Sequence, residues 1–360
     1  MAEARMQQTP LIGEYEAHGG KVVDFHGWAL PVQFRHGIVQ EHLHTRTKAS
    51  LFDCSHMGEF LISGKDTIDA YHRLVMTDVL GIKPGRGRYG ALLNEKGGIV
   101  DDIITFRLGE DDFFVVTNAG PLDVVAPQIT ACGPGATDIS SETAKIDIQG
   151  PLSREILVLE MPEAANLKYF QAIRTHWKGS PVVLARTGYT GELGFEIFVP
   201  AAVAVPLWRA LAGYDAVEPA GLGARDTLRT EVVYSLSGQD FNESRTPLEA
   251  GLDAYIAWDT EFTGKAALQQ QRDAADYPVL TPVKTADRRA PRHDFEVTHN
   301  GDRVGVVTSG TYGPSVGYGI GLAYLPRHLA KPGTTLVAGP RELPIETATA
   351  PFYRQGTCRI

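Results

Sequence analysis

Cysteine is scarce in this 360-residue chain, where only Cys54, Cys132 and Cys358 occur. Their number is odd, they are widely separated, and no Cys-x-x-Cys pair is present. This pattern argues against a disulfide-stabilised scaffold and against a cysteine-ligated zinc site. We therefore expect a protein of a reducing compartment.

Long hydrophobic runs are also missing. The most apolar stretch, residues 195–208, contains Glu196 and is followed by Arg209, and it is shorter than the ~20 residues that a membrane-spanning helix needs. The first ten residues carry Glu3 and Arg5 and have no apolar segment of the kind found in secretory signals. The sequence therefore predicts a cytoplasmic protein without a membrane partner.

Positive charge is not in excess. Lysine and arginine total 34 against 43 aspartate and glutamate residues, which gives a formal net charge of −9. Binding to a phosphate backbone normally requires a basic domain or stripe, so we expect no nucleic-acid partner. The local cluster of Arg288, Arg289 and Arg292 could meet an acidic protein or simply be solvated.

Turn-forming residues, in contrast, are abundant. The 38 glycines and 22 prolines favour many turns over long helical bundles. Short strand-like runs mix with short helical patterns without a regular β-α-β order, which is typical of an α+β fold. We expect an α+β region over residues 1–265, a connector over 266–293 and a small, barrel-like C-terminal β domain over 294–360.

The segment Gly85–Gly90 matches the Gly-x-Gly-x-x-Gly pattern letter by letter. A dinucleotide site would need a preceding strand and a following helix. Pro84 precedes the segment and a strand-like Ala91–Leu93 run follows it, so we interpret it as a turn.

Two aspartates interrupt an apolar run. Asp101 and Asp102 are neighbours in a predicted strand, so their side chains should point to opposite faces and should not easily act as a pair. The face of Asp102 also holds Val100, Ile104 and Phe106, which makes Asp102 the more desolvated of the two. A carboxylate on an apolar face has a raised pKa and needs a partner. It is either a functional residue or a structural cap or ion pair.

Glu196 lies between Phe195 and Ile197 in another predicted strand. Its carboxylate could accept two parallel hydrogen bonds from a planar donor edge, such as that of a pterin or guanine. The alternative is an ordinary exposed strand glutamate.

Two further pairs allow a binding role. Arg225 and Arg229 are one helical turn apart, so they could grip a carboxylate ligand or solvate the helix. His42 and His44 diverge if they lie on a helix, which argues against a shared metal ion. We predict no metal site.

Met57, at a predicted turn, could belong to the core or to a ligand wall.

Taken together, these segments resemble the aminomethyltransferase (T-protein) family of the glycine cleavage system. The resemblance covers nearly the whole chain and is weakest between Gln269 and Asp287. The main matching segments are His18–Lys21, Glu41–Arg46, Ser55–Met57, Asn94–Asp102, Asn118–Gly120, Gly188–Glu192, Ala220–Asp226, Thr246–Leu252, Val307–Gly310 and Pro351–Tyr353.

The resemblance implies a transferase that moves the one-carbon unit of an aminomethyl group. The group is carried on the lipoyl arm of the H-protein, and tetrahydrofolate accepts the carbon as 5,10-methylenetetrahydrofolate while ammonia is released. It implies three domains around a folate channel, with the first domain built from separated stretches of chain. No metal is implied.

Site residues follow from the same resemblance. Asp102 matches the catalytic aspartate, Glu196 the pterin-binding glutamate and Arg225 the folate-binding arginine, while Asn118 and Met57 match pocket positions. Two points depart from the family or stay open. Cys54 replaces a usually aliphatic residue, and Tyr353 cannot be assigned securely.

Two alternatives remain open at the level of sequence. One is a folate-dependent demethylase that takes a methyl group from another donor. The other is a non-catalytic folate-binding relative, against which the absence of a Lys-Gly-Cys motif counts.

Overall fold

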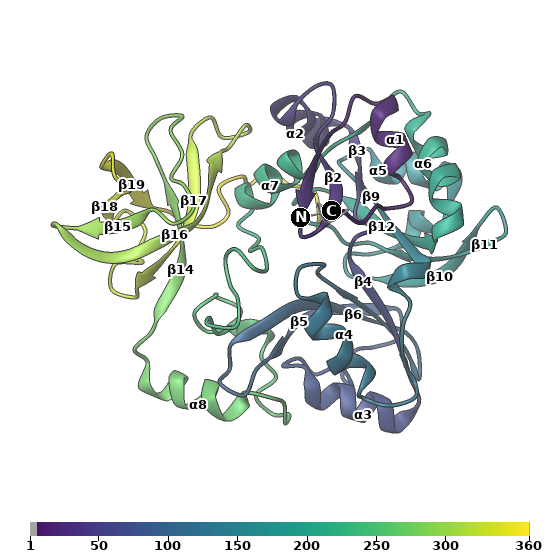
Figure 1. The fold of residues 1–360 in the computed structure, drawn as a ribbon, viewed down its shortest axis with the longest axis horizontal. Coiled ribbons are helices and arrows are strands. Elements are labelled where there is room, and N and C mark those ends of the chain that lie inside the picture. Colours follow the sequence, from purple (N-terminus) through teal and green to yellow (C-terminus); the bar gives the residue numbers. More distant parts are fainter. Residues whose placement is uncertain (1–5, 360) are drawn as a thin grey trace, which may run out of the picture.

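The computed structural model describes residues 6–359, so residues 1–5 of the expected signal-free N-terminus and Ile360 lie outside it. Two sheets, a two-stranded ribbon and a closed barrel organise the chain (Figure 1). The predicted α+β fold with a small C-terminal β-barrel domain is confirmed. Within residues 6–359, no helix combines the length and the apolar character that crossing a membrane requires.

The larger sheet has six strands in the order β10-β11-β12-β9-β3-β13. They are β3 (Ala49–Asp53), β9 (Thr143–Gln149), β10 (Ala172–Trp177), β11 (Ser180–Ala185), β12 (Gly194–Pro200) and β13 (Val217–Pro219). Three helices pack against it, namely α1 (Ile12–Ala17), α5 (Ser153–Glu160) and α6 (Ala204–Ala212). Alternation along β9 sends Ile146 and Ile148 into that core and leaves Lys145 and Asp147 on the other face.

The second sheet has five strands in the order β5-β6-β7-β4-β8. They are β4 (Gly58–Ser63), β5 (Arg86–Leu93), β6 (Ile99–Gly109), β7 (Asp112–Thr117) and β8 (Ala136–Asp138). The helices α3 (Lys65–Leu74) and α4 (Leu122–Thr130) cover it around Phe60, Tyr71 and Phe113. The chain leaves the larger sheet after β3 and returns at β9, so separated stretches of chain build the larger sheet.

The glycine-rich segment lies at the entrance to this second sheet. Gly85 has a positive φ of 77°, and strand β5 begins at the next residue. Only Gly85 of the segment belongs to the turn, so the prediction of a turn over Gly85–Gly90 is wrong for the other five residues, which are part of β5. The segment does not open a helix, as predicted.

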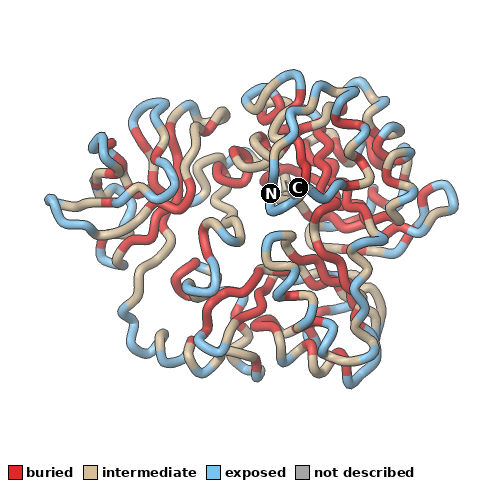
Figure 2. Tube along the Cα trace, viewed as in Figure 1, coloured by how far each residue is buried: buried red, intermediate tan, exposed pale blue. Residues whose placement is uncertain are grey.

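The C-terminal domain is a closed six-stranded barrel in the order β14-β17-β16-β15-β18-β19. Its strands are β14 (Pro278–Lys284), β15 (Glu296–His299), β16 (Asp302–Tyr312), β17 (Gly319–Pro326), β18 (Thr335–Ala338) and β19 (Leu343–Thr347). The range 266–293, expected as a connector, holds most of α8 (Lys265–Ala274) and the strand β14. Only Leu268 of α8 is buried, and Figure 2 shows this helix largely exposed.

The remaining elements join these parts. They are β1 (Lys21–Phe25) and β2 (Trp28–Gln33), the helices α2 (Ile38–Thr47) and α7 (Leu222–Glu231), and the 3-10 helices η1 (Ser140–Glu142), η2 (Pro162–Asn166), η3 (Ala201–Val203) and η4 (Asp253–Tyr255). After the barrel, the chain returns to the region of α7, where the Tyr353 backbone N–H donates to the Glu231 carbonyl.

Candidate active site

A cavity of about 1700 Å³ lies where the two sheets, α7, the segment after it and the C-terminal tail meet. All five candidate residues inferred from the sequence line this one cavity, namely Met57, Asp102, Asn118, Glu196 and Arg225. Met57 lies in the turn before β4, Asp102 on β6, Asn118 directly after β7, Glu196 on β12 and Arg225 on α7. The fold therefore brings together residues that are up to 168 positions apart.

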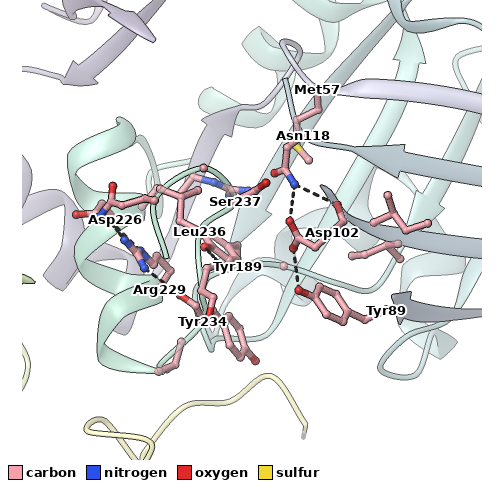
Figure 3. A pocket seen from close by; sticks show the side chains of 18 of the residues that line it. Met57, Tyr89, Asp102, Asn118, Tyr189, Asp226, Arg229, Tyr234, Leu236 and Ser237 are labelled. Carbon is pink, nitrogen blue, oxygen red and sulfur yellow. Dashed lines mark hydrogen bonds and ion pairs between the residues drawn. The ribbon is translucent and has the colours of Figure 1, made fainter. Parts of the chain in front are cut away.

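Asp102 is partly exposed to the cavity and is held by two donors (Figure 3). The Tyr89 hydroxyl donates to its Oδ2 at 2.9 Å, and the Asn118 side-chain amide donates to its Oδ1 at 2.6 Å. Burial raises the pKa of the Asp102 carboxyl group. A fixed, poorly solvated carboxylate of this kind can orient an amine or stabilise a positive charge that develops in the cavity.

The expectation that Asp102 is more desolvated than Asp101 is wrong. Asp101 is fully buried, whereas Asp102 and its neighbours Val100 and Ile104 form part of the cavity wall. The part of the apolar face next to Asp102 therefore lines a cavity, whereas Phe106 on the same face is buried in the core. Sequence periodicity identifies an apolar face but does not tell whether protein or empty space covers it.

The expectation that the two aspartates cannot act together is also wrong. The Asn118 side-chain amide lies 2.8 Å from Asp101 Oδ1 as well as 2.6 Å from Asp102 Oδ1. Its backbone N–H and the Ser237 hydroxyl also donate to Asp101. Burial raises the pKa of Asp101, and the nearby Asp102 charge raises it further. One amide thus couples two carboxyl groups.

Strand pairing explains this arrangement. The register of β5 against β6 shifts between Leu92 and Leu93, so Val100 is an extra residue beside Asp101. Such a bulge re-aims the neighbouring side chains. In the β6–β7 register, in which Ile104 is opposite Val116, the position opposite Asp102 is Asn118. No pattern in the sequence revealed either feature.

Glu196 is 5% exposed, so the alternative of an exposed strand glutamate is wrong. Its Oε1 lies 3.0 Å from the Lys145 ammonium, and its Oε2 accepts a hydrogen bond from the Thr187 hydroxyl at 2.6 Å. Each carboxylate oxygen can accept more than one hydrogen bond. The cavity-facing side of Glu196 can therefore still receive donors from a ligand.

Arg225 also faces the cavity and is anchored from behind. Its Nη1 donates to Asp147 Oδ2 at 3.0 Å, and its guanidinium carbon lies 5.1 Å from the centre of the Tyr189 ring. Only 15% of its side chain is exposed. The rest of the guanidinium group, held in this orientation, can donate to a ligand acceptor or pair with a ligand anion.

Arg229 does not share this role, and neither arginine simply solvates the helix. The Arg229 side chain is 1% exposed and donates to Asp226, Asp240 and Ser309. The bond to Ser309 joins α7 to the barrel. Buried arginines that are fully engaged in this way serve the architecture more than ligand binding.

Sequence reasoning missed several residues of the cavity. Tyr89 and Ser237 line it and contact the two aspartates, while Tyr189 and Tyr234 form a stacked pair with ring centres 5.9 Å apart. Figure 3 shows these side chains around Asp102. Tyr189 lies in the Gly188–Glu192 segment that carries the family resemblance, which was the one available signal. Tyr353 lines the cavity too.

The two histidines diverge as predicted. His42 is fully buried and contacts Thr227 and Ser315, whereas His44 contacts backbone carbonyls of Ala49 and Ala216. Across residues 6–359, no group of three His, Cys, Asp or Glu side chains is arranged to hold a metal ion.

Comparisons with known proteins identify the family. A model of the GCVT N-terminal domain matches residues 11–260, and a model of the glycine cleavage T-protein C-terminal barrel domain matches residues 279–354. The chain belongs to the glycine cleavage T-protein family. The predicted family and its transferase class are confirmed.

Individual members of the T-protein family agree over their full length. Aminomethyltransferases from Halalkalibacterium halodurans and Picosynechococcus sp. are 39% and 40% identical, over 98% and 97% of this chain and 99% and 98% of theirs. The crystal structure of the glycine cleavage system aminomethyltransferase T from Bartonella henselae is 30% identical, with a TM-score of 0.93 over 98% of this chain and 99% of that one.

Proposed function

We propose that this chain transfers the one-carbon unit of aminomethyl-lipoyl H-protein to tetrahydrofolate, giving 5,10-methylenetetrahydrofolate and ammonia. The observation that carries the proposal is the convergence of Asp102, Glu196 and Arg225 on one cavity. At about 1700 Å³ the cavity exceeds the ~300–1,000 Å³ of a typical small-molecule site. This size supports a site shared by a folate and the end of a lipoyl arm.

Each residue has a distinct role in this proposal. Glu196 accepts hydrogen bonds from the pterin donor edge, and Arg225 binds another part of the folate. Met57 contributes an apolar surface, and Asn118 holds the Asp102 carboxylate. No metal is needed for any of these tasks.

Asp102 acts on the transfer step. A folate nitrogen attacks the aminomethyl carbon, and positive charge develops there as the bonds to sulfur and nitrogen break. The fixed Asp102 carboxylate orients the folate amine and stabilises that charge without becoming a covalent nucleophile. A second folate nitrogen then bonds to the same carbon, so that two new bonds to folate nitrogens replace the two broken bonds. Each folate nitrogen gives up one proton, one to the departing ammonia and the other to the sulfur of the reduced lipoyl arm.

The proposal includes a cytoplasmic location and a lipoylated H-protein as the physiological donor. Three free cysteines, Cys54, Cys132 and Cys358, are compatible with a reducing compartment.

The test is the formation of 5,10-methylenetetrahydrofolate from aminomethyl-loaded H-protein. We expect Asp102→Asn to lower kcat by about 10²- to 10³-fold while tetrahydrofolate binding is retained. A matched control is Asp111→Asn, because Asp111 is exposed in the turn between β6 and β7, and its turnover should equal that of the parent. A parent protein that binds tetrahydrofolate without turnover would instead be a demethylase with another donor or a non-catalytic binder.

A further inference from the structure

Four charged side chains form a continuous row behind the cavity. Glu196 Oε1 lies 3.0 Å from Lys145 Nζ, which lies 2.7 Å from Asp147 Oδ1. Asp147 Oδ2 in turn accepts a hydrogen bond from Arg225 Nη1 at 3.0 Å. The signs alternate along the row, so the four formal charges cancel.

The two central members of the row are out of a ligand's reach. The side chains of Lys145 and Asp147 are both 0% exposed, and neither is among the described residues that line the cavity. The two outer members, Glu196 and Arg225, do line it. Any effect of Lys145 or Asp147 on a ligand must therefore pass through Glu196 or Arg225.

The larger sheet builds this row directly. Lys145 and Asp147 are two positions apart on β9 and so share one face of the sheet. Asp147 is the cross-strand partner of Glu196 on β12 and of Phe52 on β3. The sheet thus fixes the spacing between the two central charges and Glu196, and α7 supplies Arg225.

Stability alone does not account for such a row. Burying charges is expensive, and well-packed apolar side chains stabilise a core at least as well as a buried ion pair does. Burial opposes both charges, yet the neighbouring opposite charges prevail: the pKa of Asp147 is lowered by Lys145 and Arg225, and the pKa of Lys145 is raised by Asp147 and Glu196. Both central groups stay ionised in the core.

We infer that Lys145 and Asp147 are positioning residues for the folate: Lys145 holds Glu196 as a fixed carboxylate acceptor, and Asp147 aims Arg225 into the cavity. The inference rests on the proposed function. It assigns recognition of the pterin donor edge to the Lys145–Glu196 half of the row and general folate affinity to the Asp147–Arg225 half.

The decisive experiment compares two ligands by equilibrium titration. One is tetrahydrofolate, and the other is its analogue with a methyl group in place of the 2-amino group. We expect Lys145→Met to weaken tetrahydrofolate binding by about tenfold or more and to lose most of the parent's preference for it over the analogue. Adding Lys145→Met to a Glu196→Gln background should change that preference no further. In turnover assays KM should rise while kcat stays nearly constant.

Asp147→Asn keeps the side-chain shape and tests the other half. We expect it to weaken the binding of both ligands equally. In an Arg225→Gln background it should weaken binding no further, because coupled residues show non-additive effects. Lys284→Met is the matched control, since it breaks a lysine–glutamate pair in the barrel, with Glu346 at 3.1 Å, and should leave both affinities unchanged.

Three results would count against the inference. If Lys145→Met weakens both ligands equally, Lys145 is merely structural. If Lys145→Met changes the ligand preference further in the Glu196→Gln background, the central residues do not act through the outer ones. The same holds if Asp147→Asn weakens binding further in the Arg225→Gln background. A parent that binds no tetrahydrofolate overturns the proposed function and this inference together, whereas a parent that binds it without turnover leaves the binding test intact.

Discussion

Glu59 is a single buried side chain that lowers the stability of this fold. It lies on β4 and is fully buried, and neither of its carboxylate oxygens has a hydrogen-bond partner among the described residues. Burial raises its pKa well above the ordinary value, Asp138 and Glu196 raise it further, and Lys145 opposes them. The native state therefore binds a proton that the unfolded chain releases at neutral pH.

This difference fixes the sign of a pH effect on stability. A carboxyl group whose pKa is higher in the folded state destabilises the fold increasingly as pH rises above its unfolded value of ~4.3. We expect Glu59→Met to raise the free energy of unfolding by about 1–3 kcal/mol at pH 8 and by less at pH 5, as measured by urea unfolding at both values. Glu155→Met, on the exposed face of α5, is the control. A gain that is equal at the two pH values would contradict the assignment.

At the level of elements, local sequence patterns predicted individual helices and strands. They did not predict which distant segments pair with one another. Alternation placed Asp101, Asp102 and Glu196 on strands and pointed to Asp102. Helical spacing singled out Arg225 together with Arg229, and the resemblance chose Arg225. The bulge at Val100 and the contact of Asn118 with both aspartates depend on register. Register follows from the packing of whole sheets, which no single segment encodes.

The C-terminal tail is an element that sequence patterns could not place at all. It has no regular structure, yet Tyr353, Arg354 and Cys358 line the cavity. Thr357 fastens it, because the backbone N–H and the hydroxyl of Thr357 both donate to Glu192 Oε2, at 3.1 Å and 2.6 Å. The other oxygen of Glu192 lies 2.9 Å from Arg46 Nη1.

We expect Thr357→Val to loosen this tail. Loss of a hydrogen bond to a charged group costs about 1.5–3 kcal/mol, so the open state should be populated about 10- to 150-fold more. Trypsin cleavage after the exposed Arg354 should accelerate by a similar factor, and KM for tetrahydrofolate should rise. Thr335→Val, on the exposed surface of β18, should change neither. An unchanged cleavage rate in Thr357→Val would mean that Glu192 does not hold the tail.

At the scale of the whole molecule, one buried carboxylate makes several of the contacts that join the barrel to the rest of the chain. Asp240 follows α7 and is 1% exposed. Its Oδ1 accepts hydrogen bonds from the hydroxyls of Thr308 at 2.5 Å and Ser309 at 2.6 Å, both on β16. Arg229 on α7 donates to Asp240 Oδ2 at 2.5 Å and to Ser309 at 2.8 Å. The cavity is bounded on one side by this junction, because Arg229 also lines it.

Removing the charge of Arg229 alone should lower the free energy of unfolding more than removing the charges of both Arg229 and Asp240. Arg229→Met leaves Asp240 as a buried charge without its counter-charge, so we expect it to lower the free energy of unfolding by about 3–5 kcal/mol. Adding Asp240→Asn removes the stranded charge, and the double variant should recover part of that loss in calorimetry. Arg303→Met breaks an exposed pair with Glu296 in the same barrel and should cost less than about 1 kcal/mol. If the double variant is no more stable than Arg229→Met alone, the charge of Asp240 is not what Arg229 compensates, and the junction depends on its hydroxyl contacts instead.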